Sequence, residues 1–177
     1  MKNLNNLSKV FLFICFLSGI LWLGSYIARI TLAYQLFQGN DFALNSYITN
    51  QNLSGIFITL NAGIILESTL YIAFIITLIF FIIFSKINLK NNGWLLIVLL
   101  IVFVTLPFEI YLKTIDYKII MTMNAGVFSN SDILQLYIRR FKVLGSFPIV
   151  ETLSYFAVLY FILFKPFKAK SEILNEN

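Results

Sequence analysis

Residues 63–86, GIILESTLYIAFIITLIFFIIFSK, decide the fold class of this chain. Between Glu67 and Lys86 the stretch carries no charge, and most of its side chains are large and apolar. A helix needs about 20 apolar residues to cross the hydrocarbon core of a bilayer, which is about 30 Å thick. The stretch therefore predicts a membrane-spanning helix, because a helix satisfies its own backbone hydrogen bonds in lipid.

Three further stretches, at residues 10–32, 94–113 and 148–168, have a similar length and hydropathy. Of the whole chain, 59% is hydrophobic and only 12% is charged, whereas a soluble domain is about half apolar and about a quarter charged. This composition excludes a soluble enzyme, a disordered chain and a disulfide scaffold. We predict an all-α integral membrane protein with four transmembrane helices, in which residues 1–177 form a single domain and residues 171–177 are a polar C-terminal tail.

Several kinds of chemistry are excluded by residues that the chain lacks. The sequence has no histidine, and Cys15 is its single cysteine. These absences exclude an imidazole general base, a histidine-ligated haem or zinc ion, and an internal disulfide. No nucleotide-binding, hydrolase or metalloprotease motif is present either. We therefore expect no cofactor, no bound metal and no enzymatic activity.

Basic residues flank the predicted spans and indicate their orientation. Lysines gather beside the first, second and fourth spans, at Lys2, Lys9, Lys86, Lys90, Lys165, Lys168 and Lys170. The connection at residues 38–61 has neither lysine nor arginine. The excess of positive charge in cytoplasmic loops predicts both termini in the cytoplasm. We expect a bacterial inner membrane, with an organellar inner membrane as the alternative, and no nucleic-acid partner, because the basic residues form no stripe.

The second long connection opposes this orientation, because it contains Lys118, Arg139, Arg140 and Lys142. We expect an amphipathic helix in each extracytoplasmic connection. In the second, Ser131 or Asp132 is a suitable N-cap, and apolar residues follow at helical spacing, with the arginines on the other side. These apolar residues are Leu134, Tyr137, Phe141 and Leu144. Such a helix either lies in the membrane interface or is a solvated connector, and both interpretations stay open.

An offset of 84 residues aligns the chain with itself and suggests a tandem duplication of two αα-hairpins, residues 1–86 and 87–170. Glu67 falls on Glu151, Tyr71 on Tyr155 and Arg29 on Lys113. The ungapped alignment gives 11 identities in 77 pairs, only modestly above chance for so apolar a sequence. Both interpretations, duplication and chance likeness of apolar helices, therefore stay open.

The ionisable residues inside the spans are the candidate functional residues, because a charge in lipid is costly. At about 1.5 Å rise per residue, Arg29 and Glu67 reach the same level of the outer membrane boundary. We therefore expect them to form an ion pair. The seven candidates for ion or partner binding are Arg29, Glu67, Tyr71, Glu109, Lys113, Glu151 and Tyr155.

The second half of the chain places two acids and one lysine near the same boundary. Glu109 and Lys113 are an i,i+4 pair, and we expect Glu151 to join them, with Tyr155 donating a hydrogen bond to Glu151. In one interpretation, two carboxylates share one lysine and bind a proton or a cation. In the other, the three charges form a polar staple between two helices.

Two functional hypotheses follow from these features. The first is a non-enzymatic accessory or binding subunit of a larger membrane assembly, with other membrane subunits or further copies of this chain as partners. Small size and missing catalytic chemistry favour it. The second is an oligomeric transporter or channel subunit that uses its outer carboxylates to bind protons or cations.

Overall fold

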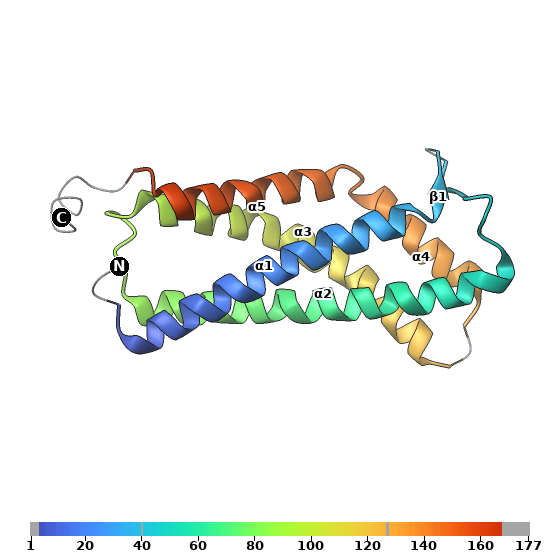
Figure 1. The fold of residues 1–177 in the computed structure, drawn as a ribbon, viewed down its shortest axis with the longest axis horizontal. Helices are drawn as coiled ribbons and strands as arrows, with labels where there is room; N and C mark the ends of the chain where they lie inside the picture. The colour runs from blue at the N-terminus through green and yellow to red at the C-terminus, as the bar shows by residue number, and fades with distance from the viewer. Residues whose placement is uncertain (1–3, 40, 127, 168–177) are drawn as a thin grey trace.

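The computed structural model describes residues 4–39, 41–126 and 128–167. The described chain is almost entirely helical, with one small β-hairpin (Figure 1). Its elements are α1 (Asn6–Tyr34), β1 (Phe37–Gln38), β2 (Ala43–Leu44), α2 (Asn50–Ser85), α3 (Gly93–Asn124), α4 (Asn130–Val143) and α5 (Phe147–Phe164). Four of them, α1, α2, α3 and α5, are long and apolar enough to cross a membrane.

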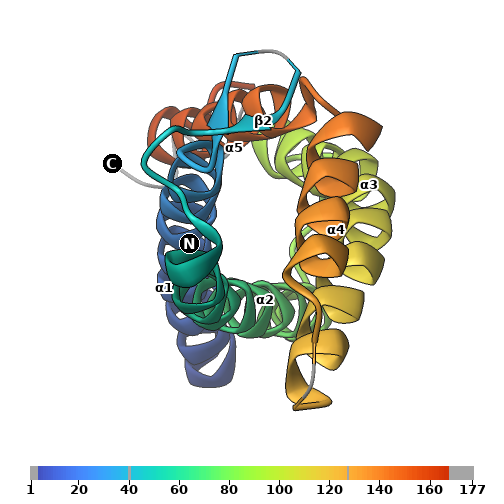
Figure 2. The same ribbon diagram turned by 90° about the vertical axis from the view of Figure 1, so that its right-hand side faces the viewer.

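The four long helices form an elongated bundle whose two ends differ. Helix α1 packs along α2, and α3 packs against α5 (Figure 1). Viewed along its length, the bundle is a ring of helices, with α4 lying over α3 (Figure 2). Leu4 and Phe167 lie at one end, called here the termini end, and the β-hairpin and α4 lie at the other, called the α4 end (Figure 1).

A first apolar core fills the bundle toward the termini end. It contains Cys15, Trp22, Leu23, Tyr26, Tyr71, Phe74, Leu78, Phe81, Trp94, Leu95, Val98, Val102, Tyr155 and Val158. Aromatic rings make up much of it, and Trp22 stacks on Phe74 with ring centroids 5.8 Å apart. The outward faces of the same helices are also apolar, as membrane helices require: Phe13, Leu163 and Phe103 are each at least 67% exposed.

A second apolar core lies at the α4 end, where α2 and α3 are longer than a span requires. Helix α2 has 36 residues and α3 has 32, against about 20 for a bilayer crossing. The second core contains Ala33, Leu36, Phe37, Leu53, Phe57, Leu60, Ile64, Ile119, Met123, Ile133, Tyr137 and Phe141. The extended ends of α2 and α3 thus form a small packed unit with α4 and the β-hairpin.

The expectation of a separate helix in the first long connection is wrong. Strands β1 and β2 pair there as an antiparallel hairpin, with Phe37 opposite Leu44, and the helical residues of this connection, from Asn50 on, belong to α2. Gly39 and Phe42 adopt positive φ angles of 70° and 56° in its turn. The Asn45 side chain donates to the Gln35 and Phe37 carbonyls at 3.1 and 3.4 Å. Glycine, asparagine and serine in this segment favour turns, because they tolerate left-handed backbone or bond to it.

The second connection contains α4, but one of its basic residues does not lie where the sequence pattern put it. The helix begins after Ser129, two residues before the expected N-cap. Tyr137 and Phe141 are buried, whereas Arg139 and Lys142 are exposed. Arg140 was expected on the solvent side, yet it is only 4% exposed. The reason is a buried ion pair with α3.

Candidate functional site: a buried charged layer

Seven charged side chains form a layer between the two apolar cores, here called the charged layer: Arg29, Glu67, Glu109, Lys113, Asp116, Arg140 and Glu151. Its place follows from the helices themselves. On α2, Glu67 lies between Ile64 of the second core and Tyr71 of the first; on α1, Arg29 lies between Tyr26 and Ala33. Six of the seven residues are buried, and the Lys113 side chain is 18% exposed.

Glu67 is the centre of one half of the layer. Its Oε1 accepts a hydrogen bond from Trp22 Nε1 at 2.8 Å. Its Oε2 lies 3.4 Å from Arg29 Nη2 and also accepts a hydrogen bond from Lys113 Nζ. Glu67 is completely buried, and a buried carboxylate persists only when such donors replace its water. These contacts join α1, α2 and α3.

Asp116 is the centre of the other half. Its Oδ1 accepts hydrogen bonds from Arg29 Nη1 and Arg140 Nε, both at 3.2 Å, and its Oδ2 lies 3.8 Å from Lys113 Nζ. Arg29 therefore bridges the two acids, Glu67 and Asp116. Because Arg140 belongs to α4, this half of the layer fixes α4 to the bundle.

Glu109 and Glu151 differ from the other two acids. Both are completely buried, and within the described residues none of their four carboxyl oxygens has a hydrogen-bond partner. The two carboxyls are neighbours, and Tyr26 lies beside Glu151. The Lys113 Nζ atom lies 3.9 Å from Glu109 Oε2. These two acids, here called the carboxyl pair, are the weakly compensated part of the layer.

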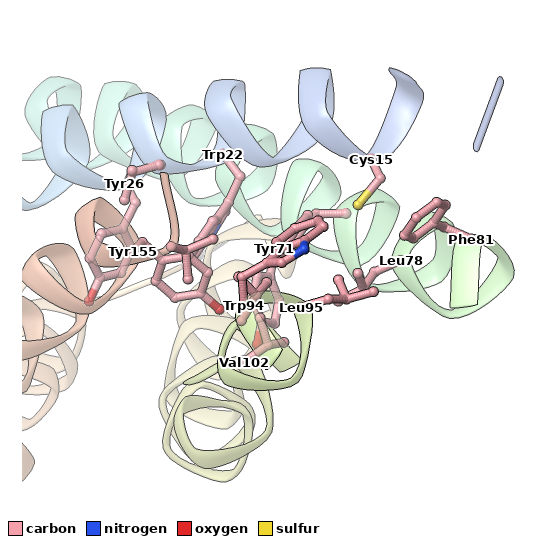
Figure 3. Packing of buried hydrophobic residues seen from close by; sticks show 14 residues of the cluster. Cys15, Trp22, Tyr26, Tyr71, Leu78, Phe81, Trp94, Leu95, Val102 and Tyr155 are labelled. Carbon is pink, nitrogen blue, oxygen red and sulfur yellow. The ribbon is translucent and has the colours of Figure 1, made fainter. Parts of the chain in front are cut away.

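Aromatic side chains of the first core lie on the side of the charged layer that faces the termini end. Trp22 lies among Tyr26, Tyr71 and Tyr155, and its ring centroid is 4.6 Å from that of Tyr155 (Figure 3). Lys113 Nζ lies 5.8 Å from the centre of the Tyr71 ring. Within the described residues, the hydroxyls of Tyr26 and Tyr71 have no hydrogen-bond partner. The hydroxyl groups of Tyr26 and Tyr71 therefore add polar atoms near the carboxyl pair.

The structure agrees with part of the predicted contacts and corrects others. Arg29 does contact Glu67, and Glu109 does contact Lys113. The prediction for Tyr155 was wrong: its hydroxyl is 3.2 Å from Thr105 Oγ1, because Thr105 on α3 faces it directly. Lys113 was expected between Glu109 and Glu151 but turns toward Glu67, where a second cation and an indole N–H already gather.

Sequence reasoning missed Trp22, Asp116 and Arg140. Two signals were present. Asp116 follows Lys113 by three residues, which puts both on one helix face, but the span was ended at Lys113. Arg140 follows Tyr137 by three residues on the apolar stripe of α4. Trp22 gave no signal other than its position in the middle of a span, where a tryptophan normally packs against other side chains.

The balance of charge sets what the layer can do. Four carboxyls face three cations, so the fully ionised layer has one negative charge in excess. An uncompensated charge in a dry interior costs several kcal/mol, and a proton or a small cation at the carboxyl pair removes it. Among the described residues, no group of three or more acidic or cysteine side chains forms a metal site.

No family model, curated protein or solved structure matches this chain. Its class is therefore described from its fold and its candidate site alone. It is a helical bundle with four helices long and apolar enough to cross a membrane and a charged layer buried between its two apolar cores.

Proposed function

We propose that the protein binds a proton at the carboxyl pair, exchanges it for a monovalent cation, and works as an oligomeric transporter or channel subunit without enzymatic activity. The observation that carries the proposal is the complete burial of Glu109 and Glu151 side by side, where the neighbours of the Glu151 carboxyl are Glu109 and Tyr26 and no cation of the described residues forms an ion pair with it. Ionisable groups placed in this way inside membrane proteins typically belong to proton or ion pathways.

The other two acids of the charged layer support a structural role for themselves and a binding role for the carboxyl pair. Glu67 and Asp116 have strong donors from three different helices, so they match the staple interpretation. Glu109 and Glu151 lack such donors, so they match the binding interpretation. The sequence suggested the staple for Glu109, Lys113 and Glu151; we propose it instead for Glu67 and Asp116, and the binding role for Glu109 and Glu151.

Ion flux through vesicles tests the proposal. We expect the reconstituted protein to move protons across the bilayer, and Glu109→Gln and Glu151→Gln to reduce that flux at least tenfold. Asp132→Asn is the matched control, because Asp132 is exposed on α4. Wild-type flux equal to that of empty vesicles for protons, sodium and potassium would contradict the proposal, and so would full flux in both glutamine variants.

A partner-binding role, as an accessory subunit, is the second candidate function. Ile58, Tyr117 and Met121 are each at least 48% exposed, and they lie on the parts of α2 and α3 that extend beyond Glu67 and Lys113. Apolar side chains exposed outside the lipid favour a protein contact. Photo-crosslinkers at Tyr117 should then capture another membrane subunit or a second copy. Crosslinking only to lipid would exclude this candidate.

We infer that the membrane is a bacterial inner membrane and that the termini end is cytoplasmic. Exposed Lys9, Lys86 and Lys90 lie at that end, and positive residues favour the cytoplasmic side. The opposing charge of the second connection is weakened, because Arg140 is buried in an ion pair. A C-terminal fluorescent protein should fluoresce, and a C-terminal alkaline phosphatase should be inactive; the opposite pattern would invert the topology.

We also infer that residues 1–86 and 87–170 descend from one duplicated hairpin. Three pairs of aligned residues support this, because each pair lies in the charged layer or beside it: Arg29 with Lys113, Glu67 with Glu151, and Tyr71 with Tyr155. Co-expressed fragments divided between Asn88 and Leu89 should assemble in the membrane. Fragments that never associate would argue against two hairpin units.

A further inference from the structure

The first core contains a cavity, and no residue of the charged layer lines it. It measures about 100 Å³ and is lined by side chains of α1, α2, α3 and α5. Its lining is almost wholly apolar and includes Cys15, Phe81, Val98 and Val158. Figure 3 shows Cys15 on α1 across from Leu78 and Phe81 of α2. An apolar cavity of this size stays dry and accepts an apolar guest.

The cavity opens between α1 and α5. Two of its lining residues on α1, Phe16 and Ile20, are 43% and 46% exposed on the helix surface. On the other side, Leu159 and Ile162 of α5 are half-buried. Since both helices are apolar enough to span a membrane, the opening faces the hydrocarbon, and an acyl chain can enter it sideways.

The termini end of the cavity carries polar features that fit a lipid headgroup. Trp94 lines this end and is 4% exposed, yet within the described residues its indole Nε1 has no hydrogen-bond partner. Lys165 Nζ lies 5.9 Å from the centre of the Trp94 ring. A buried indole N–H normally meets an acceptor, and an ester or phosphate oxygen of a lipid would supply one.

Positive charge at the termini end of the cavity favours an anionic lipid. Lys9 is exposed and stands three residues before Leu12, so it continues the α1 stripe that lines the cavity. In the described residues, every carboxylate lies in the charged layer or on its α4 side. The rim of the cavity is therefore positive, and basic residues at a membrane surface attract anionic lipids.

We propose that the cavity between α1 and α5 binds one acyl chain of an anionic phospholipid, with the headgroup held at the termini end by Lys9 and the Trp94 indole N–H. The proposal stands on the cavity and its rim, and it does not depend on proton binding at the carboxyl pair. Part of the acyl chain would fill this cavity of about 100 Å³ and contact α1 and α5 together.

Cys15 reports on this site, because it lines the cavity and is the only cysteine in the chain. We would measure its rate of labelling by N-ethylmaleimide in vesicles of phosphatidylcholine, with and without phosphatidylglycerol. The expected result is labelling at least fivefold slower with phosphatidylglycerol. Glycerol phosphate in solution should give no protection, because it lacks an acyl chain.

Two sets of variants test the contact with the lipid headgroup and the contact with the acyl chain separately. Lys9→Gln should abolish the protection by phosphatidylglycerol, whereas Lys90→Gln, an exposed lysine outside the cavity, should retain it. Native mass spectrometry should show one phosphatidylglycerol retained by the wild-type protein and lost by the cavity-filling variants Val98→Phe and Val158→Phe. Leu17→Phe, on the outer face of α1, should retain it.

Equal labelling rates in the two kinds of vesicle would overturn the proposal. Retention of the lipid by a correctly folded cavity-filling variant would overturn it as well. If one filling variant fails to fold, the other gives the answer, because the two residues lie on different helices. Neither result depends on ion flux, so the lipid site and the proposed function can fail separately.

Discussion

Replacement of Glu151 and of Glu67 by glutamine should have opposite consequences, although both residues are completely buried acids. Glu67 accepts bonds from Trp22 and Lys113 and pairs with Arg29. Its replacement takes one of two carboxylate partners from buried Arg29 and the hydrogen-bond acceptor from part-buried Lys113, and breaking a buried ion pair costs about 3–5 kcal/mol. Glu151 has no ion pair to lose in the described chain and lies beside Glu109 and Tyr26, and its replacement by glutamine removes the excess negative charge of the layer as a bound proton does.

The expected free energies convert into measurable melting temperatures. For a chain of this size, each kcal/mol shifts the melting temperature by about 2–4 °C. Glu67→Gln should therefore lower it by about 6–20 °C, from the cost of a broken buried pair. Glu151→Gln should change it by less than about 4 °C, because glutamine replaces a carboxyl that is already neutral when the pair holds its proton.

Differential scanning fluorimetry of both variants in one detergent at neutral pH gives the comparison. Asp132→Asn, at an exposed position, is the baseline for a change of charge alone. If Glu151→Gln destabilises the protein as strongly as Glu67→Gln, Glu151 is a paired structural acid. The reasoning that divides the layer into a staple and a binding pair would then be refuted.

Three further predictions concern other contacts of the layer and of α4. Arg140→Met should destabilise the protein by about 3 kcal/mol and raise hydrogen exchange in α4, whereas exposed Arg139→Met should change stability by less than about 0.5 kcal/mol; equal effects would contradict the buried pair. Trp22→Phe should cost about 2 kcal/mol in detergent unfolding, because the bond to Glu67 involves a charged acceptor; an unchanged stability would exclude that bond. Burial raises the pKa of the Tyr137 hydroxyl above its ordinary value, so stability present at neutral pH should decline as the pH rises above about 10. Tyr137→Phe should remove part of that decline, and an identical pH profile would show that Tyr137 is ionised freely in the folded state.

The membrane helices and half of the layer could be predicted from sequence because they depend on local properties. Hydropathy alone locates the spans, since lipid imposes its thickness on each helix separately. The pairing of Arg29 with Glu67 follows from depth, because two residues at one level of adjacent helices meet if they face each other. The contact between Glu109 and Lys113 follows from helical spacing.

The remaining contacts depend on how the helices are rotated and placed, which one sequence does not determine. Lys113 contacts Glu67, the same carboxylate that Arg29 and Trp22 contact from another helix. Arg140 was assigned to water because arginine is usually exposed. Its burial becomes visible only when α4 is placed over Asp116.

The first connection shows the same limit for local structure. Turn-forming residues were visible between Gly39 and Ser46, but their hairpin depends on bonds that Asn45 makes to the end of α1. The early part of the connection therefore folds back on α1, and its last part joins α2, which begins at Asn50.

Infrared spectroscopy tests the central claim most directly, because it detects the carbonyl stretch of a protonated carboxylic acid. The protein would be studied at neutral pH in a buffer whose only cation is a bulky organic amine. We predict a protonated carboxyl band in the wild-type protein that is lost when Glu109→Gln and Glu151→Gln are combined, and that Asp132→Asn leaves intact. A wild-type spectrum without such a band, or a band that survives in the double variant, would contradict the assignment of the carboxyl pair as the proton-binding site.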